Sequence, residues 1–185
     1  EPPAGRHIRP AGEETRAGET VIAAGTVLNP AHLAIAAVCG HDELPVLRRP
    51  EVALLLTGDE VVTAGIPAPG KVRDTFGPAL PAIIRRLGGV ASRTVRLPDD
   101  FGTMLAAVRG CGADVVVTTG GTGHSQADHL RPVLAELGAR ILVQSIRMRP
   151  GHPALLARLP DGRPLVGLPG NPLAAIMALL TLGAP

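Results

Sequence analysis

The chain has 185 residues, of which 45% are hydrophobic and 18% charged, and its formal net charge at pH 7 is +2. This length and apolar content suffice for one globular domain with a real core and a small additional segment. With so small a net charge, two Phe and no Trp or Tyr, the chain offers neither a basic patch nor base-stacking rings, so we expect no nucleic-acid partner.

Two further features of the sequence bear on its class. No apolar run is long enough to span a membrane and no signal peptide precedes Glu1, so we expect a cytoplasmic protein without a membrane partner. Cys39 and Cys111 stand alone, without the spacing of metal ligands, and we expect both to be small buried residues.

The first 46 residues are expected to form a part of their own. Residues 1–18 are rich in Pro, Gly and charge, and residues 19–28 hold two short apolar pieces, which favours a small hairpin or an extended loop. Asn29 followed by Pro30 predicts a helix that ends by Gly40. Because residues 41–50 are charged and flanked by proline, we divide the chain into an N-terminal linking segment, 1–46, and an α/β domain, 47–185.

Strand and helix patterns alternate from Glu51 onward. Apolar or β-branched runs predict strands at 52–56, 93–97, 114–118 and 140–145, and helical spacing predicts helices from 74 or 75 to 88, from 98–100 onward, from 125 to 138 and over 173–182. Pro81 is expected to distort the first turns of its helix. Residues 155–159 and 164–168 flank a Pro-Asp-Gly-Arg turn, which predicts a hairpin. The alternation predicts an α/β fold with a three-layer, doubly wound, mostly parallel sheet, preceded by a small β-rich or irregular segment.

Residues 114–128 read Asp-Val-Val-Val-Thr-Thr-Gly-Gly-Thr-Gly-His-Ser-Gln-Ala-Asp. This pattern is typical of a buried strand, a glycine turn and a helix start, with Ser125 opening the helix and Asp128 in its first turn. Such a turn directs backbone N–H groups at an anion, often a phosphate. The same pattern also occurs as a plain tight connection in α/β proteins, so it does not establish a site by itself.

Acidic residues follow three of the predicted strands. They are Asp59 and Glu60, then Asp99, and finally Asp128. Ligands of such sheets bind at the carboxyl ends of the strands, so these side chains are expected to share one cleft. Carboxylates around an anion-binding turn require a shared divalent cation or perturbed pKa values. Asp99 and Asp128 can also be read as plain helix-start residues.

Four motifs occur in order along the chain. They are Thr57-Gly-Asp-Glu60, the Thr119-Gly-Gly121 loop closed by Asp128, Arg149-Pro-Gly-His-Pro153 and Gly167-Leu-Pro-Gly-Asn-Pro172. Together they resemble the MoeA-type molybdopterin molybdenumtransferases, including the E domain of gephyrin, and residues 8–28 resemble the segment that precedes the molybdopterin-binding domain there. The resemblance implies a dimeric enzyme of molybdenum cofactor biosynthesis that hydrolyses adenylated molybdopterin, releases AMP and inserts molybdate.

The resemblance also implies roles for individual residues. Glu60, Asp99 and Asp128 match catalytic acidic positions, and Glu14 matches one that faces the site across the homodimer. Glu60 and Asp128 would hold Mg2+. The residues implied in binding molybdopterin and molybdate are Thr119, Gly120, Gly121, Ser145, Arg149, Pro150, Gly151, His152, Gly170, Asn171 and Pro172.

Several positions depart from the family's pattern. Ser145 and Arg149 replace lysines, Phe76 replaces an asparagine, and His124, expected to face solvent, lies in the glycine loop. Arginine keeps the positive charge and binds an oxyanion well, whereas serine does not replace a cation. Two alternatives therefore stay open, a molybdopterin adenylyltransferase-like enzyme and a diverged non-catalytic molybdopterin-binding module. Residues 8–28 argue against the first, and Ser145 and Phe76 favour the second. The choice between molybdate and tungstate also stays open.

Overall fold

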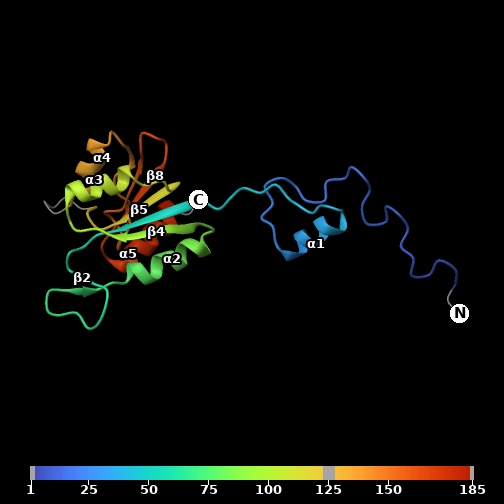
Figure 1. Ribbon diagram of the computed structural model, residues 1–185, viewed down its shortest axis with the longest axis horizontal. Helices are drawn as coiled ribbons and strands as arrows, with labels where there is room; N and C mark the ends of the chain where they lie inside the picture. The colour runs from blue at the N-terminus through green and yellow to red at the C-terminus, as the bar shows by residue number, and fades with distance from the viewer. Residues whose placement is uncertain (1–2, 123–127, 184–185) are drawn as a thin grey trace. The chain divides into compact units, whose positions relative to one another are not determined.

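The computed structural model describes residues 3–122 and 128–183, and it divides the chain into two compact units, Glu1–Leu47 and Arg48–Pro185 (Figure 1). Along the chain the elements are α1 (Pro30–Val38), β1 (Glu51–Leu56), β2 (Val61–Val62), β3 (Val72–Arg73), α2 (Phe76–Arg86), β4 (Val90–Arg96), α3 (Phe101–Arg109), β5 (Val115–Thr119), α4 (Leu130–Glu136), β6 (Arg140–Val143), β7 (Leu155–Arg158), β8 (Pro164–Leu168), α5 (Pro172–Ala178) and the π-helix η1 (Leu179–Gly183).

In the N-terminal unit, α1 is the one regular element among residues 3–47. Its N-cap is the predicted Asn29, whose side chain accepts a hydrogen bond from the His32 N–H at 3.0 Å. Residues 19–28 form turns and extended loop, so of the two forms expected for them the loop is observed. Cys39 at the end of α1 is exposed, so the expectation of burial was wrong there, because Ala36 is the only buried residue of this short helix. Cys111 is buried as predicted.

The second unit contains a six-stranded sheet in the order β4-β1-β5-β8-β7-β6. The strands β4, β1, β5 and β8 run parallel, and β7 is antiparallel to both of its neighbours. The predicted hairpin is formed, since β7 and β8 pair from Leu155 opposite Gly167 to Arg158 opposite Pro164. The predicted doubly wound, mostly parallel α/β fold is confirmed.

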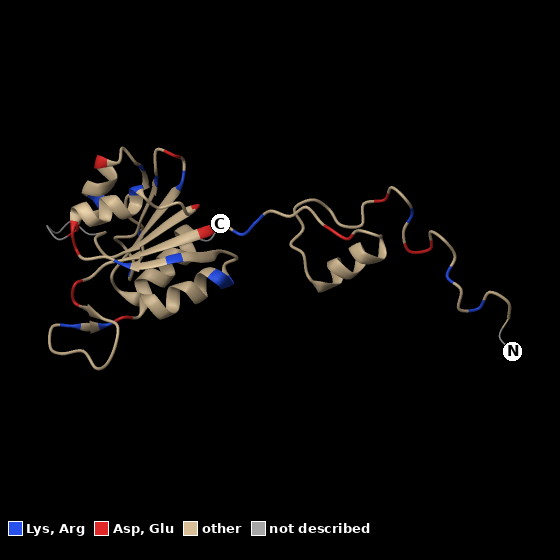
Figure 2. Cartoon of the chain, in the orientation of Figure 1, with Lys and Arg blue, Asp and Glu red and all other residues tan. Residues whose placement is uncertain are grey.

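Helices cover both faces of the sheet, α3 and α4 on one face and α2 and α5 on the other (Figure 1). Alternate residues of β1 enter the two cores, Leu55 on the α3–α4 side and Leu54 on the α2–α5 side. This double burial explains why the central strands read as continuous apolar runs. Lys and Arg lie on several strands and helices rather than on one element (Figure 2). Among the described residues, no helix is long and apolar enough to cross a bilayer.

Several boundaries differ from the predicted ones. Strand β4 begins at Val90, three residues early, because the Val90 N–H bonds the Pro50 carbonyl and extends the pairing with β1. Helix α2 continues through Pro81, which is the sixth of its eleven residues. The two-residue strands β2 and β3 were not predicted, since two residues show no periodicity.

The helix after the glycine loop begins at Leu130 in the described chain. The predicted helix start at Ser125 and the position of His124 lie outside the described residues. Asp128 was expected within the first helical turn and instead precedes it, because the first helical hydrogen bond runs from the Val133 N–H to the His129 carbonyl at 3.0 Å.

Candidate functional site

A cavity of about 640 Å³ opens where the parallel strands of the second unit end. Its described lining is Thr57, Gly58, Glu60, Val61, Val72, Arg73, Asp74, Thr75, Phe76, Asp99, Gly120, Gly121, Asp128, Gly170, Asn171 and Pro172. The strand order places the carboxyl ends of β4, β1, β5 and β8 side by side, which brings these distant segments together. Of the acidic residues predicted for the site, Glu60, Asp99 and Asp128 all line this cavity.

The turn after β1 is fixed by two carboxylates. The Asp99 carboxylate accepts hydrogen bonds from the Gly58 N–H at 3.0 Å and the Asp59 N–H at 3.1 Å. In return, the Asp59 carboxylate accepts one from the Asp99 N–H at 3.2 Å. Both oxygens of Asp99 are therefore engaged in shaping the turn that presents Glu60 to the cavity.

The floor of the cavity ties three strands together. The buried Thr57 hydroxyl donates to the Thr119 carbonyl at 2.6 Å, which joins β1 to β5. The Gly120 N–H donates to the Leu168 carbonyl at 2.9 Å, which joins β5 to β8. Thr119 is itself buried and lies beneath the lining, whereas Gly120 and Gly121 form part of the wall. The N–H of Gly120 is thus used within the sheet rather than directed at a ligand.

Asp74 is a cavity residue that the sequence did not single out as a site residue. Its carboxylate accepts hydrogen bonds from the Phe76 and Gly77 N–H groups at 3.0 Å each, and it lies 2.8 Å from the Arg96 guanidinium. Burial opposes the charge of Asp74, but the Gly77 N–H, Arg96 and the Phe76 N–H outweigh it and hold the pKa of this carboxyl below its usual value. The sequence signals for Asp74 were its place before a helix and its match to the first residue of the Asp-Ser-Asn pattern from which Phe76 departs.

The start of α5 forms the wall next to β8. Gly170, Asn171 and Pro172 line the cavity as their motif suggested. The Asn171 side chain caps α5, since its oxygen accepts a hydrogen bond from the Ala174 N–H at 3.0 Å. The amide oxygen is therefore committed to the helix.

The predicted binding residues from Ser145 to His152 are not part of this lining. They form a loop closed by the Ile146 N–H on the His152 carbonyl at 3.1 Å and by His152 Nδ1 on the Ile146 carbonyl at 3.0 Å. Because a carbonyl oxygen cannot donate, Nδ1 is the donor. Ser145, Arg149, Pro150 and His152 are exposed. Gly151 is buried, and a Cβ there would lie 3.5 Å from the Ala174 carbonyl of α5.

The remaining predictions for the site concern Glu14 and the Mg2+ ligands. Glu14 belongs to the N-terminal unit, where its carboxylate lies 2.6 Å from the Arg9 guanidinium. Within residues 3–122 and 128–183, no three His, Cys, Asp or Glu side chains converge as metal ligands. Glu60 and Asp128, the predicted Mg2+ ligands, share the wall of the cavity.

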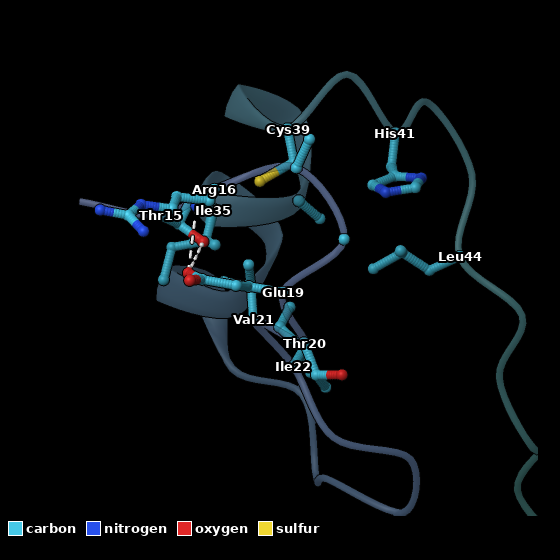
Figure 3. A pocket seen from close by; sticks show the side chains of 13 residues that line it. Thr15, Arg16, Glu19, Thr20, Val21, Ile22, Ile35, Cys39, His41 and Leu44 are labelled. Atoms are coloured by element: carbon cyan, nitrogen blue, oxygen red, sulfur yellow. Dashed lines mark hydrogen bonds between the residues drawn. The ribbon is translucent and has the colours of Figure 1, made fainter. Parts of the chain in front are cut away.

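The N-terminal unit has a hollow of its own, about 520 Å³ in volume, between residues 15–22 and α1 (Figure 3). Cys39 and His41 lie on its rim, and Glu19 accepts hydrogen bonds from the Thr15 hydroxyl at 3.2 Å and the Arg16 N–H at 3.0 Å. None of the site residues predicted from the sequence lines this hollow. Apart from Glu14, the site residues predicted from the sequence all lie in the second unit.

Comparison with known proteins finds family matches for both parts of the chain. Residues 53–185 match the family described as a probable molybdopterin binding domain, and residues 1–40 match the MoeA N-terminal region (domain I and II). A curated molybdopterin molybdenumtransferase from Nostoc sp. is 34% identical over 186 residues, which cover 95% of this chain and 42% of that protein. Molybdopterin molybdenumtransferase 2 from Mycobacterium tuberculosis is 33% identical over 183 residues, covering 94% and 45%.

A solved structure supports the same relationship. The molybdopterin biosynthesis MoeA protein from Pyrococcus horikosii matches 85% of this chain and 39% of its own with a TM-score of 0.72 and 31% identity. The chain thus spans less than half the length of these relatives. The resemblance found in the four motifs is confirmed, and the chain belongs to the family of probable molybdopterin binding domains.

Proposed function

We propose that the second unit binds adenylated molybdopterin in the 640 Å³ cavity and that the protein acts in molybdenum cofactor biosynthesis, inserting molybdate with release of AMP. The observation that supports this best is the meeting of Glu60, Asp99, Asp128 and the glycine turn after β5 in one cavity. The names of the relatives from Nostoc sp. and Mycobacterium tuberculosis point to the same transferase activity.

A Mg2+ ion fits the acidic wall. In proteins this ion is held by one or two carboxylates, with water and substrate phosphate completing its shell, so it does not require a three-residue cluster. Glu60 and Asp128 are the two carboxylates that we assign to it. The ion would offset the negative charge of the wall and stabilise charge on the adenylate phosphate.

Other residues of the protein have separate roles in positioning Glu60 and in binding molybdate. Asp99 positions Glu60, because its carboxylate oxygens accept hydrogen bonds from the Gly58 and Asp59 N–H groups, which precede Glu60 in the turn. Arg149 and Ser145 supply donors for molybdate from the exposed loop beside α5, and a guanidinium forms charge-assisted hydrogen bonds with an oxyanion. His152 has Nδ1 engaged as a donor to the Ile146 carbonyl, and in the neutral ring Nε2 is then an acceptor, so we assign this ring to holding the loop in shape rather than to donating to the anion.

The assembly and location of the protein are part of the proposal. We propose a cytoplasmic homodimer in which Glu14 of one protomer faces the cavity of the other. Sedimentation equilibrium of the purified chain tests the dimer. If the chain is a dimer, Glu14→Gln should lower the turnover of adenylated molybdopterin without changing the sedimentation result. A monomer that turns over normally would exclude this role of Glu14.

Titration calorimetry with adenylated molybdopterin, with and without Mg2+, tests the binding proposal. We expect binding that strengthens with Mg2+, and we expect Glu60→Gln and Asp128→Asn to lose that strengthening. Glu136→Gln is the matched control, because this exposed glutamate at the end of α4 lies outside the cavity lining. A folded wild-type chain that binds no ligand would contradict the proposal.

The two alternatives give different results in turnover assays. Formation of adenylated molybdopterin from ATP and molybdopterin would indicate the adenylyltransferase. Binding without molybdate-dependent AMP release would indicate a non-catalytic binding module. Release of AMP that depends on molybdate supports the transferase, and a parallel assay with tungstate identifies the preferred oxyanion.

A further inference from the structure

Arg96 and Asp74 form an ion pair that links the end of one strand to the wall of the cavity. The Arg96 and Asp74 side chains are 24% and 10% exposed, which makes this the least exposed of the ion pairs among the described residues. An ion pair at this depth is not an ordinary surface contact, because removing one partner leaves the other charge poorly solvated.

The pair connects segments that are far apart in the sequence. Arg96 is the last residue of β4, and its guanidinium lies 2.8 Å from Asp74 and 3.5 Å from the Thr57 carbonyl at the end of β1. Asp74 in turn holds the N–H groups of Phe76 and Gly77 in the first turn of α2, and its own N–H bonds the Val62 carbonyl. Arg96 therefore braces the wall that Asp74, Thr75 and Phe76 contribute to the cavity.

The ion pair also compensates the charge of one acidic residue of the cavity. Among the described residues, four carboxylates line it, those of Glu60, Asp74, Asp99 and Asp128. Asp74 already has a protein cation at 2.8 Å and two N–H donors, so its charge is compensated within the protein. An added cation gains little from a carboxylate that an arginine already neutralises.

We propose that Arg96 is a positioning residue for ligand binding, which holds Asp74 and the first turn of α2 in place and withdraws Asp74 from the carboxylates that share a divalent cation. This inference rests on the proposed function, because its ligand is adenylated molybdopterin. It adds two residues to the site and predicts that their effect on affinity is independent of Mg2+.

The test compares dissociation constants for adenylated molybdopterin with and without Mg2+. We expect Arg96→Met and Asp74→Asn each to weaken binding at least about tenfold in both conditions, the lower end of the loss seen when an orienting outer contact is removed. The double variant should bind no more weakly than the worse single variant, because both changes break one contact. Arg96→Lys should recover part of the affinity.

Two further variants test whether a loss of affinity comes from the ion pair itself. Arg93→Met removes an exposed arginine from the same strand and should bind like the wild type. Gly77→Ala keeps both charges but adds a methyl group where the Asp74 carboxylate lies, so it should weaken binding in the same way. If Arg96→Met does not fold, Arg96→Lys and Gly77→Ala provide the same measurement.

Three results would overturn the inference. Wild-type affinity in folded but less stable Arg96→Met and Asp74→Asn proteins would show that the pair is only structural. Loss of only the Mg2+-dependent part in Asp74→Asn, as expected for Glu60→Gln, would make Asp74 a cation ligand. A wild-type chain that binds no ligand would overturn the proposed function, and this inference with it.

Discussion

Gly120 packs so closely against the Thr57 hydroxyl in the floor of the cavity that a side chain has no room there. Gly120 has a φ of +74°, and a Cβ at this position would lie 2.7 Å from the Thr57 hydroxyl oxygen. Gly120→Ala therefore faces two costs. The left-handed backbone conformation costs about 1–2 kcal/mol for a residue with a Cβ, and displacing the hydroxyl from the Thr119 carbonyl loses a hydrogen bond worth about 1 kcal/mol.

Together these terms predict that Gly120→Ala lowers the free energy of unfolding by about 2–3 kcal/mol. Gly138→Ala is the matched control, because Gly138 has a φ of +70° but no atom within 4 Å of its would-be Cβ. The control should lose only the backbone cost, about 1–2 kcal/mol. Urea unfolding followed by circular dichroism measures both values.

A double-mutant cycle isolates the contact. Thr57→Ala removes the hydroxyl, so Gly120→Ala in that background no longer displaces it and the two losses should fall short of additivity by about 1 kcal/mol. Equal losses for Gly120→Ala and Gly138→Ala, together with additivity in the cycle, would show that the Thr57 hydroxyl does not hold the cavity floor.

Three further predictions concern the ends of the sheet and the exposed loop. Arg48 and the Glu51 N–H hold the pKa of Asp114 at about 2. The ionised Asp114 side chain therefore stabilises the fold above about pH 4, and this stabilisation is lost as the pH falls towards 2. The urea midpoint of unfolding should vary less between pH 4 and pH 2 for Asp114→Asn than for the wild type. Asn171→Ala should lower the free energy of unfolding by about 1 kcal/mol and Asn171→Gly by only a few tenths, as measured in urea, because glycine is an acceptable N-cap. Arg149→Ala should leave the affinity for adenylated molybdopterin unchanged but slow molybdate-dependent AMP release by about tenfold to 100-fold, the loss of one charge-assisted hydrogen bond; equal losses in binding and release would contradict this separation.

The fold could be predicted because the hydrophobic pattern determines it over long stretches. The run from Val52 to Leu56 is apolar at every position, and it becomes the central strand β1, buried on both faces. The pair β2–β3 was missed because it is held by backbone bonds such as the Val72 N–H on the Glu60 carbonyl, which no side-chain pattern records.

The candidate site was only partly accessible to sequence reasoning. Glu60 and Asp99 could be expected there because they follow strands whose carboxyl ends meet at one edge. Arg96 and Asp74 could not, because their partnership depends on the side-by-side placement of β4 and the β3–α2 connection, which is a tertiary property. Motif matching also grouped Arg149 with the cavity residues, although its loop lies outside the described lining.

The difference between the cavity and the loop at residues 145–152 bears on what the departures from the family's pattern mean. Phe76 lines the cavity, so the loss of an amide there would affect the ligand that is proposed to bind inside it. Ser145 lies in the exposed loop, outside that lining, so the loss of a lysine there would affect the proposed oxyanion step instead. Within the proposed function, binding of the adenylated ligand and insertion of the metal are therefore expected to be separable. Because Glu60, Asp99 and Asp128 all line one cavity, the proposed binding step has its expected carboxylates, and the proposed oxyanion step is the one that would distinguish an active transferase from a binding module.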